Sequence, residues 1–122
     1  MSGEKSRRLS ERTVDYGLAA IDYCEGLPRT FAGRHVADQL LRSATSVAAN
    51  YAEASEAESP ADFIHKLRLA LKELKESRVW LCFGERIDPS RSVESLRQES
   101  HELMLMLASS IATSQRRALQ GK

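Results

Sequence analysis

The sequence predicts an all-α protein, an antiparallel up-down-up-down four-helix bundle that forms a single domain over residues 1–122. Apolar residues recur every three or four positions along most of the chain. No alternating apolar and polar stretch is long enough to indicate a strand. The composition is rich in Ala, Leu, Glu, Lys and Arg, which favour helix. Connections of roughly 5 to 8 residues between successive helices favour antiparallel neighbours.

The first two helices are predicted from their apolar spacing. A first helix is expected from about Ser6 to Gly26, with an apolar face made of Leu9, Thr13, Tyr16, Ala20, Tyr23 and Leu27. The segment "GLPRTFAG" contains two glycines and a proline and ends this helix. A second helix is expected from about Arg34 to Glu56, with an apolar face made of Val36, Leu40, Ala44, Val47, Tyr51 and Ala54.

The start of the third helix is marked by three coinciding signals. Ser59 is the expected N-cap, Pro60 suits the first helical position, and Asp62 completes a capping box. This helix is expected to run to about Arg86. The segment "IDPSRS" then ends it, and a fourth helix is expected from Ser90 or Ser92 to about Leu119.

The third helix carries apolar residues on two nearly opposite faces. One face is suited to the bundle core and comprises Phe63, Leu67, Ala70, Leu71, Leu74 and Leu81. The second face comprises Leu69, Trp80, Phe83 and Ile87. A single core uses one of these faces, so the second face indicates a contact between subunits. The alternative is that Trp80 and Phe83 cover a loop at the end of the helix.

The stretch "RSATSVAANYAEAS" in the second helix is dominated by small side chains. Its alanines allow a neighbouring helix to approach closely. Its polar residues recur at spacings of 3, 4 and 3 and form one row, which consists of Ser43, Ser46, Asn50 and Glu53. We expect this row to supply acceptors for a charged donor on the next helix.

Arg78 is the expected donor, because its helical phase places it near the apolar face of the third helix. A charge in that position is costly unless it is paired. Glu53 lies too far along the bundle, since about 27 Å of helix separates Arg78 from Pro60. The expected partners are therefore Asp38, Asp22 or Glu25, or an acid of a neighbouring subunit. The alternative is that Arg78 extends to solvent near the end of its helix and that the polar row of the second helix is ordinary solvated surface.

The net charge of +1 indicates no overall attraction to nucleic acid or to an acidic membrane. Basic residues nevertheless cluster towards both ends of the chain: Lys5, Arg7, Arg8, Arg12, Arg116 and Arg117. In an up-down bundle these ends lie together, so they form a candidate RNA- or DNA-binding patch. The turn between the second and third helices lies at the same end, and its acids oppose that patch: Glu53, Glu56, Glu58 and Asp62.

No motif predicts catalysis, a metal or a cofactor. The three histidines are scattered, and neither a phosphate-binding glycine loop nor a nucleophile elbow occurs. Cys24 and Cys82 lack the spacing of a zinc or redox motif, and we expect both to be buried, reduced thiols. No apolar run suits export or membrane insertion, so the expected location is the cytoplasm.

Residues 40–81 resemble the four-helix-bundle family of 23S rRNA-intervening sequence proteins, also called S23 ribosomal proteins. The resemblance lies in "QLLRSATSVAANYAEA" and, after a short polar loop, "DFIHKLRLALKELKESRVWL". The matching polar positions are Arg42, Ser43, Ser46, Asn50, Glu53, Glu73, Glu76, Ser77 and Arg78; the matching apolar positions are Ala52, Phe63, Ala70, Trp80 and Leu81. The family usually has glycine where this chain has Ala54.

The resemblance implies an antiparallel bundle that assembles into a homopentameric ring and has no associated enzymatic activity. A distant relative is the basic accessory protein of diversity-generating retroelements, which partners a reverse transcriptase and nucleic acid. We therefore expect a non-enzymatic homo-oligomeric scaffold or interaction protein of bacterial type, whose partner the sequence does not name. The alternative is an accessory protein that binds RNA or DNA through the terminal basic patch.

Overall fold

The structure is a computed structural model that describes the backbone of residues 2–121 and the side chains of residues 8–121. It contains four helices: α1 (Ser2–Glu25), α2 (Phe31–Ser55), α3 (Pro60–Ile87) and α4 (Glu94–Gln120). No strand occurs within residues 2–121. The predicted all-α, four-helix architecture is confirmed.

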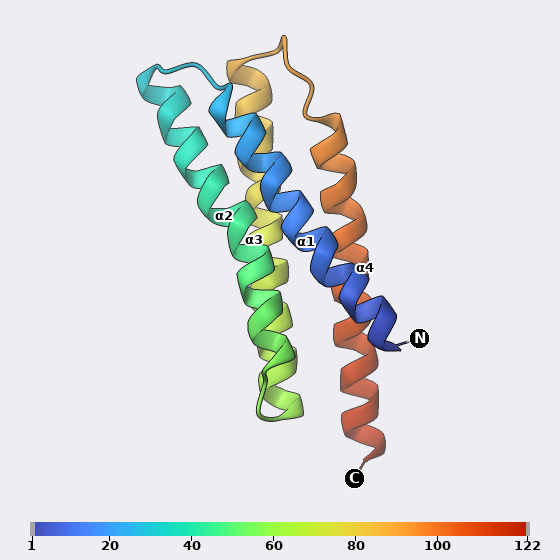
Figure 1. The fold of residues 1–122 in the computed structure, drawn as a ribbon. Coiled ribbons are helices and arrows are strands. Elements are labelled where there is room, and N and C mark those ends of the chain that lie inside the picture. The colour runs from blue at the N-terminus through green and yellow to red at the C-terminus, as the bar shows by residue number, and fades with distance from the viewer. Residues whose placement is uncertain (1, 122) are drawn as a thin grey trace.

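Each helix runs antiparallel to the one before it, so α1 and α3 point the same way (Figure 1). α1 packs against α2 and α4, and α3 also packs against α2 and α4. The start of α1 and the end of α4 lie towards the end of the bundle that carries the α2–α3 turn, as the sequence predicted (Figure 1). The α1–α2 and α3–α4 connections lie together at the opposite end.

α2 begins three residues earlier than predicted, because Gly33 belongs to its first turn. Thr30 is the N-cap, and its Oγ1 accepts a hydrogen bond from the Gly33 N–H at 3.1 Å. A side chain at position 33 would overlap the Pro28 carbonyl oxygen. The glycine is therefore required by close approach of the preceding turn, and it does not interrupt the helix.

The predicted start of α3 is confirmed, with one difference in its capping bonds. The Ser59 Oγ accepts a hydrogen bond from the Asp62 N–H at 3.1 Å, and Pro60 is the first helical residue. The Asp62 carboxylate accepts from the N–H of Glu58 at 3.4 Å, whereas a capping box would use the N–H of Ser59. At the start of α4, the Ser92 Oγ accepts from the Glu94 N–H.

The core confirms the predicted faces of α1 and α2, because every residue assigned to them is buried. On α3 the buried positions follow spacings of 3 and 4, as in coiled-coil packing, and they are Leu67, Ala70, Leu74, Ser77, Leu81 and Gly84. Phe63 and Leu71 are half-buried at the edge of the core. Ser77 and Gly84 thus occupy core positions that were not predicted.

Two tyrosines of α1 reach across the bundle to the diagonally opposite α3. The Tyr16 hydroxyl and Ser77 Oγ are 2.8 Å apart, and the Ser77 hydroxyl also lies 2.6 Å from the carbonyl oxygen of Leu74. Burial raises the pKa of Tyr16, and its hydrogen bond with Ser77 partly offsets that rise. The Tyr23 hydroxyl packs against Gly84 and makes no hydrogen bond within the described residues.

We expect the two tyrosine-to-phenylalanine changes to have different effects. Tyr16→Phe removes the partner of a buried hydroxyl and should lower the free energy of unfolding by about 1 kcal/mol. Tyr23→Phe removes a hydroxyl that is buried without a partner, so it should leave that free energy unchanged or raise it by up to about 1 kcal/mol. Urea titration of both variants measures the difference. Equal losses in the free energy of unfolding of the two variants would contradict the assignment of a hydrogen-bond partner to Tyr16 alone.

Candidate interaction surfaces

The outer side of the α2–α3 pair carries an aromatic cluster. The Trp80 ring lies edge-on to His35, with ring centroids 5.5 Å apart, and its centroid is also 5.5 Å from that of Phe83. Phe83 is 52% exposed, and Trp80 is half-buried. At the start of α2, Phe31 is 88% exposed. Large apolar rings are therefore available to a partner at this end of the pair.

Ion pairs adjoin the aromatic cluster and orient its indole. Arg42 pairs with Glu73 at 3.1 Å and with Glu76, and the Trp80 Nε1–H donates to the same Glu76 carboxylate at 3.2 Å. Partial burial raises the pKa of Glu76, but hydrogen bonds from Arg42 and Trp80 outweigh it and hold that pKa below its usual value. The charged carboxylate thus fixes the indole. We call His35, Arg42, Glu73, Glu76, Trp80 and Phe83 the α2–α3 surface.

The four predicted interface residues divide into two environments. Trp80 and Ile87 are half-buried and pack partly on the core. Phe83 is more open, and Leu69 lines a shallow hollow beside Arg42. Trp80 packs on the first turns of α2 through His35 and remains half-buried. The contact between subunits stays a prediction.

The row of small polar residues on α2 bonds mainly to its own helix. Ser43 Oγ donates to the Gln39 carbonyl, Ser46 Oγ to the Arg42 carbonyl, and Asn50 Nδ2 to the Ser46 carbonyl, at 2.9, 2.7 and 2.9 Å respectively. Glu53 pairs with Lys66 of α3 at 3.3 Å. The expectation that this row accepts hydrogen bonds from Arg78 is wrong, because these groups are satisfied locally.

Arg78 lies on the side of α3 that faces α4, away from the polar row of α2. Its Nη1 donates to the Sδ of Met104 at 2.9 Å. Within the described part of the chain no carboxylate lies within 4 Å of Arg78, so the predicted pairing with Asp38, Asp22 or Glu25 is wrong. The physical reason is a phase error of one residue, since Ser77 occupies the inward position. Pairing with an acid of another subunit stays a prediction.

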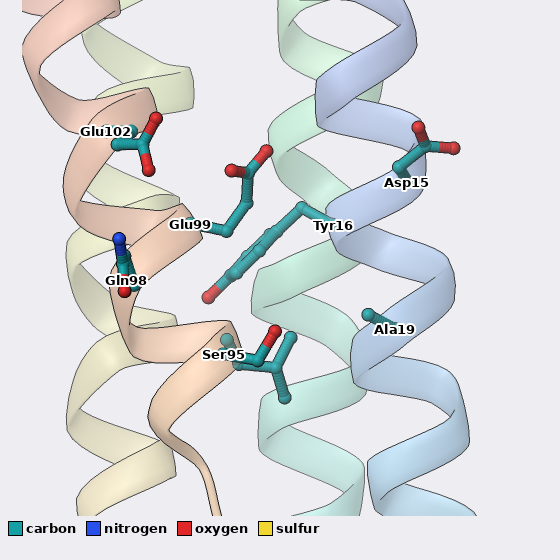
Figure 2. Close-up of a pocket in the computed structure, with 8 residues that line it drawn as sticks. Asp15, Tyr16, Ala19, Ser95, Gln98, Glu99 and Glu102 are labelled. Carbon is teal, nitrogen blue, oxygen red and sulfur yellow. The ribbon is translucent and has the colours of Figure 1, made fainter.

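A groove of ≈ 320 Å³ runs between α1 and α4 (Figure 2). Tyr16 reaches into it from α1, and Glu99 and Glu102 line it from α4, whereas Asp15 points outward from α1. Arg12 engages both glutamates of α4, at 2.7 Å to Glu99 and 3.1 Å to Glu102. The hydrogen bond to Glu99 is the largest cause of the raised pKa of Arg12. These acids are thus neutralised within the chain.

The candidate nucleic-acid patch is less basic than the sequence suggested. Arg12 is paired with two glutamates, while Arg8, Arg116 and Arg117 are exposed. Lys5 and Arg7 lie outside the residues whose side chains are described. At the same end of the bundle, a hollow of ≈ 430 Å³ is lined by Lys66, which pairs with Glu53, and by four acids at the α2–α3 turn: Glu53, Glu56, Glu58 and Asp62. The negative potential of these acids therefore opposes the positive potential of the exposed arginines.

The two cysteines differ in environment, and the prediction that both are buried is wrong for Cys82. Cys82 is exposed on the outer side of α3, whereas Cys24 is half-buried and its Sγ donates to the Ala37 carbonyl oxygen at 3.4 Å. Burial raises the pKa of the Cys24 thiol to about 11.

In the dissociated monomer, where Cys82 is exposed, we expect Cys82 to react with iodoacetamide before Cys24. At pH 8 the thiolate form of Cys24 is scarce because its pKa is about 11, and its partial burial also limits access. Raising the pH towards 11 should increase the rate for Cys24 as the thiolate forms. Peptide mass spectrometry over time measures both rates. Faster modification of Cys24 at pH 8 would contradict the buried environment.

The histidines are dispersed over the molecule. His35 contacts Trp80, and His65 and His101 are exposed on α3 and α4. Among the side chains described, no three His, Cys, Asp or Glu residues come together in a way that could hold a metal ion. Across the same residues, no helix is both long enough and apolar enough to cross a membrane.

The sequence pattern of the 23S rRNA-intervening sequence proteins matches residues 8–109, which include most of all four helices. The chain belongs to the 23S rRNA-intervening sequence protein family. A crystal structure of a protein with unknown function from the S23 ribosomal protein family of Bacteroides thetaiotaomicron is similar to this family member at a TM-score of 0.79. The two sequences are 30% identical over 88% of this chain and 98% of the other. A comparison of this sequence with curated proteins found no match.

The family assignment confirms the resemblance found in residues 40–81 and extends it to the outer helices. The family description names no enzymatic activity, and the solved relative is described as a protein with unknown function.

Proposed function

We propose that the protein is a non-enzymatic, homo-oligomeric scaffold or interaction module that assembles through the α2–α3 surface. The observation that carries the proposal is the aromatic cluster of Trp80, Phe83 and His35, which stands at an accessible position on two long helices. Aromatic side chains are typical anchors of protein interfaces, because they bury a large area at a low cost in side-chain entropy.

The fixed orientation of the indole supports this role. Glu76 accepts the Trp80 Nε1–H while Arg42 pairs with Glu76, so the ring is held before any partner arrives. An anchor that is already ordered loses less conformational entropy on binding. The polar groups at the edge of the cluster also satisfy one another, which lowers the cost of removing them from water.

The proposed assembly is a pentameric ring, a number that rests on the family resemblance. A ring requires a head-to-tail contact between two different surfaces, because a self-complementary contact closes at a dimer. The terminal basic patch carries no second proposal, since Arg12 is neutralised and acids of the α2–α3 turn lie at the same end.

Light scattering coupled to size-exclusion chromatography tests the proposal. The purified chain should elute as a multimer with a mass near five times its 13.6 kDa monomer at micromolar concentration. A monomer of 13.6 kDa under these conditions would overturn it. Tight binding of a chosen RNA by the assembled protein at physiological salt would instead favour the nucleic-acid function.

A further inference from the structure

The outer sides of α1 and α3 carry charged rows of opposite sign. On α1 a row at spacings of 4, 3, 4 and 3 consists of Glu11, Asp15, Leu18, Asp22 and Glu25, and we call it the α1 row. On α3 a row at spacings of 4, 3, 4, 3 and 4 consists of Arg68, Lys72, Lys75, Val79, Cys82 and Arg86, and we call it the α3 row. Every residue of both rows is exposed. Each row has an exposed apolar residue near its middle, Leu18 at 55% and Val79 at 53%.

The charges of both rows form no ion pair among the described residues, although the charge of Lys72 helps to lower the pKa of Glu76. No acid of the α1 row and no base of the α3 row lies within 4 Å of an opposite charge. Asp15 points away from the groove shared with α4, as Figure 2 shows. Like charges three or four residues apart repel each other on a helix. The repulsion within each row therefore slightly destabilises its helix, and a surface of the opposite charge would relieve that repulsion.

The two rows match in height along the bundle. Tyr16 and Ser77 are level, because their hydroxyl oxygens are 2.8 Å apart, and seven residues further on Tyr23 packs against Gly84. Counting from the Tyr16–Ser77 level, Glu11 and Lys72 both lie five residues before it. Leu18 and Val79 both lie two residues after it, and Glu25 and Arg86 both lie nine residues after it.

This equality of height matters in a ring. Copies related by rotation about an axis parallel to the helices are not shifted along that axis, so each residue keeps its height in every copy. α1 and α3 also point the same way and lie at diagonally opposite corners of the bundle (Figure 1). One copy can therefore present its α1 row to the α3 row of the next copy with acids facing bases.

We propose that the α1 row of one copy docks on the α3 row of the next copy. This inference rests on the proposed assembly and names the second surface that a head-to-tail ring needs. Glu11 faces Lys72, Leu18 packs on Val79, and Glu25 faces Arg86. Asp15 approaches Lys75 with an offset of one residue, since it is level with Glu76. Two further positions match less well, since Asp22 is level with Phe83 and Arg8 is level with Leu69, beside Arg68. The α3 row borders Phe83, so it extends the α2–α3 surface.

Charge reversal tests the docking. The variants are Glu11→Lys with Glu25→Lys, Lys72→Glu with Arg86→Glu, and the combination of all four changes. Each double variant should raise the dissociation constant of the contact by at least roughly tenfold, because attraction becomes repulsion. The fourfold variant should recover the wild-type mass, because acids and bases face each other again with their helices exchanged. Light scattering over a concentration series measures all three.

Controls separate docking from a general charge effect. Glu56→Lys with Glu58→Lys, and Arg116→Glu with Arg117→Glu, make the same charge changes on exposed residues outside the rows and should leave the mass unchanged. Circular dichroism checks that each variant folds. The wild-type assembly should also weaken as salt screens the rows.

The outcomes distinguish the two proposals. Double variants that assemble like the wild type, or a fourfold variant that stays dissociated, would overturn the docking of the rows. If Trp80→Ala dissociates the protein while the double variants assemble normally, the proposed assembly stands and the docking of the rows is wrong. A wild-type monomer at micromolar concentration overturns both.

Discussion

Replacing Trp80 with alanine is expected to convert the proposed assembly largely to monomer. The substitution removes the largest ring of the α2–α3 surface and leaves Glu76 without its indole donor. Truncation of an aromatic anchor in a protein interface costs about 2 kcal/mol or more per contact. In a ring every copy contributes such a contact, so the loss is repeated around the assembly.

Size-exclusion chromatography with light scattering measures the effect, and thermal unfolding shows whether the fold is intact. Trp80 packs partly on the core, so Phe83→Ala is the second variant, because it removes a 52% exposed ring from the same cluster. Leu105→Ala is the matched control, an exposed apolar residue of α4 outside that surface. Wild-type mass in both aromatic variants would exclude the α2–α3 surface as the subunit contact.

Replacing Gly84 with alanine is expected to lower the free energy of unfolding by about 2 kcal/mol, since inserting a methyl group into a packed core forces its neighbours to move. A Cβ at this position would lie 2.5 Å from the Tyr23 hydroxyl and 3.1 Å from its ring. The ring has little room to withdraw, because Arg91 stacks over it at 4.8 Å and donates to the Tyr23 carbonyl oxygen at 2.7 Å.

Two further variants make the Gly84 result specific. Tyr23→Phe removes the nearest atom, so it should recover part of the loss when combined with Gly84→Ala. Gly17→Ala is the control, because a Cβ there would lie at ordinary distances of 3.6 Å or more from α2. It should stabilise the helix by about 0.5–1 kcal/mol. Chemical denaturation of the wild type, Gly84→Ala, Tyr23→Phe and the double variant measures the coupling between the two positions. If the changes in the free energy of unfolding simply add in the double variant, the Tyr23 contact is contradicted.

The fold was predictable where local spacing and packing agree. On α1 and α2 every residue of the two predicted apolar faces is buried, because these residues recur at helical spacing. Three further buried residues were not assigned to those faces, and they are Gly17, Gly33 and Ser43. The N-cap of α3 was predictable because Ser59 and Pro60 act within one turn. The start of α2 was not, because the role of Gly33 depends on the path of the Pro28 backbone, a contact outside the helix.

The phase of α3 shows why the interior polar contact was missed. Arg78 looked inward because it follows leucines at helical spacing, but the inward residue is Ser77. A serine is suited to the core here because Tyr16 bonds to it from the diagonal helix. That partner is 61 residues away in sequence, so no local pattern indicates it. The exposed aromatic cluster was partly predictable, from the second apolar face of α3, whereas His35 joins it through tertiary packing.

The bond between Tyr16 and Ser77 also limits the alternative structures open to the folding chain. Leucine and alanine layers look alike from one helical turn to the next, so a helix that slides by a turn of about 5.4 Å loses little apolar contact. The same slide of α3 would bring Leu74 or Leu81 to the place of Ser77, so the buried Tyr16 hydroxyl would lose its hydrogen bond with Ser77 at a cost of about 1 kcal/mol. One polar contact thereby separates the native arrangement from near-degenerate competitors and lets a core of repeated small and branched residues fold to a single state.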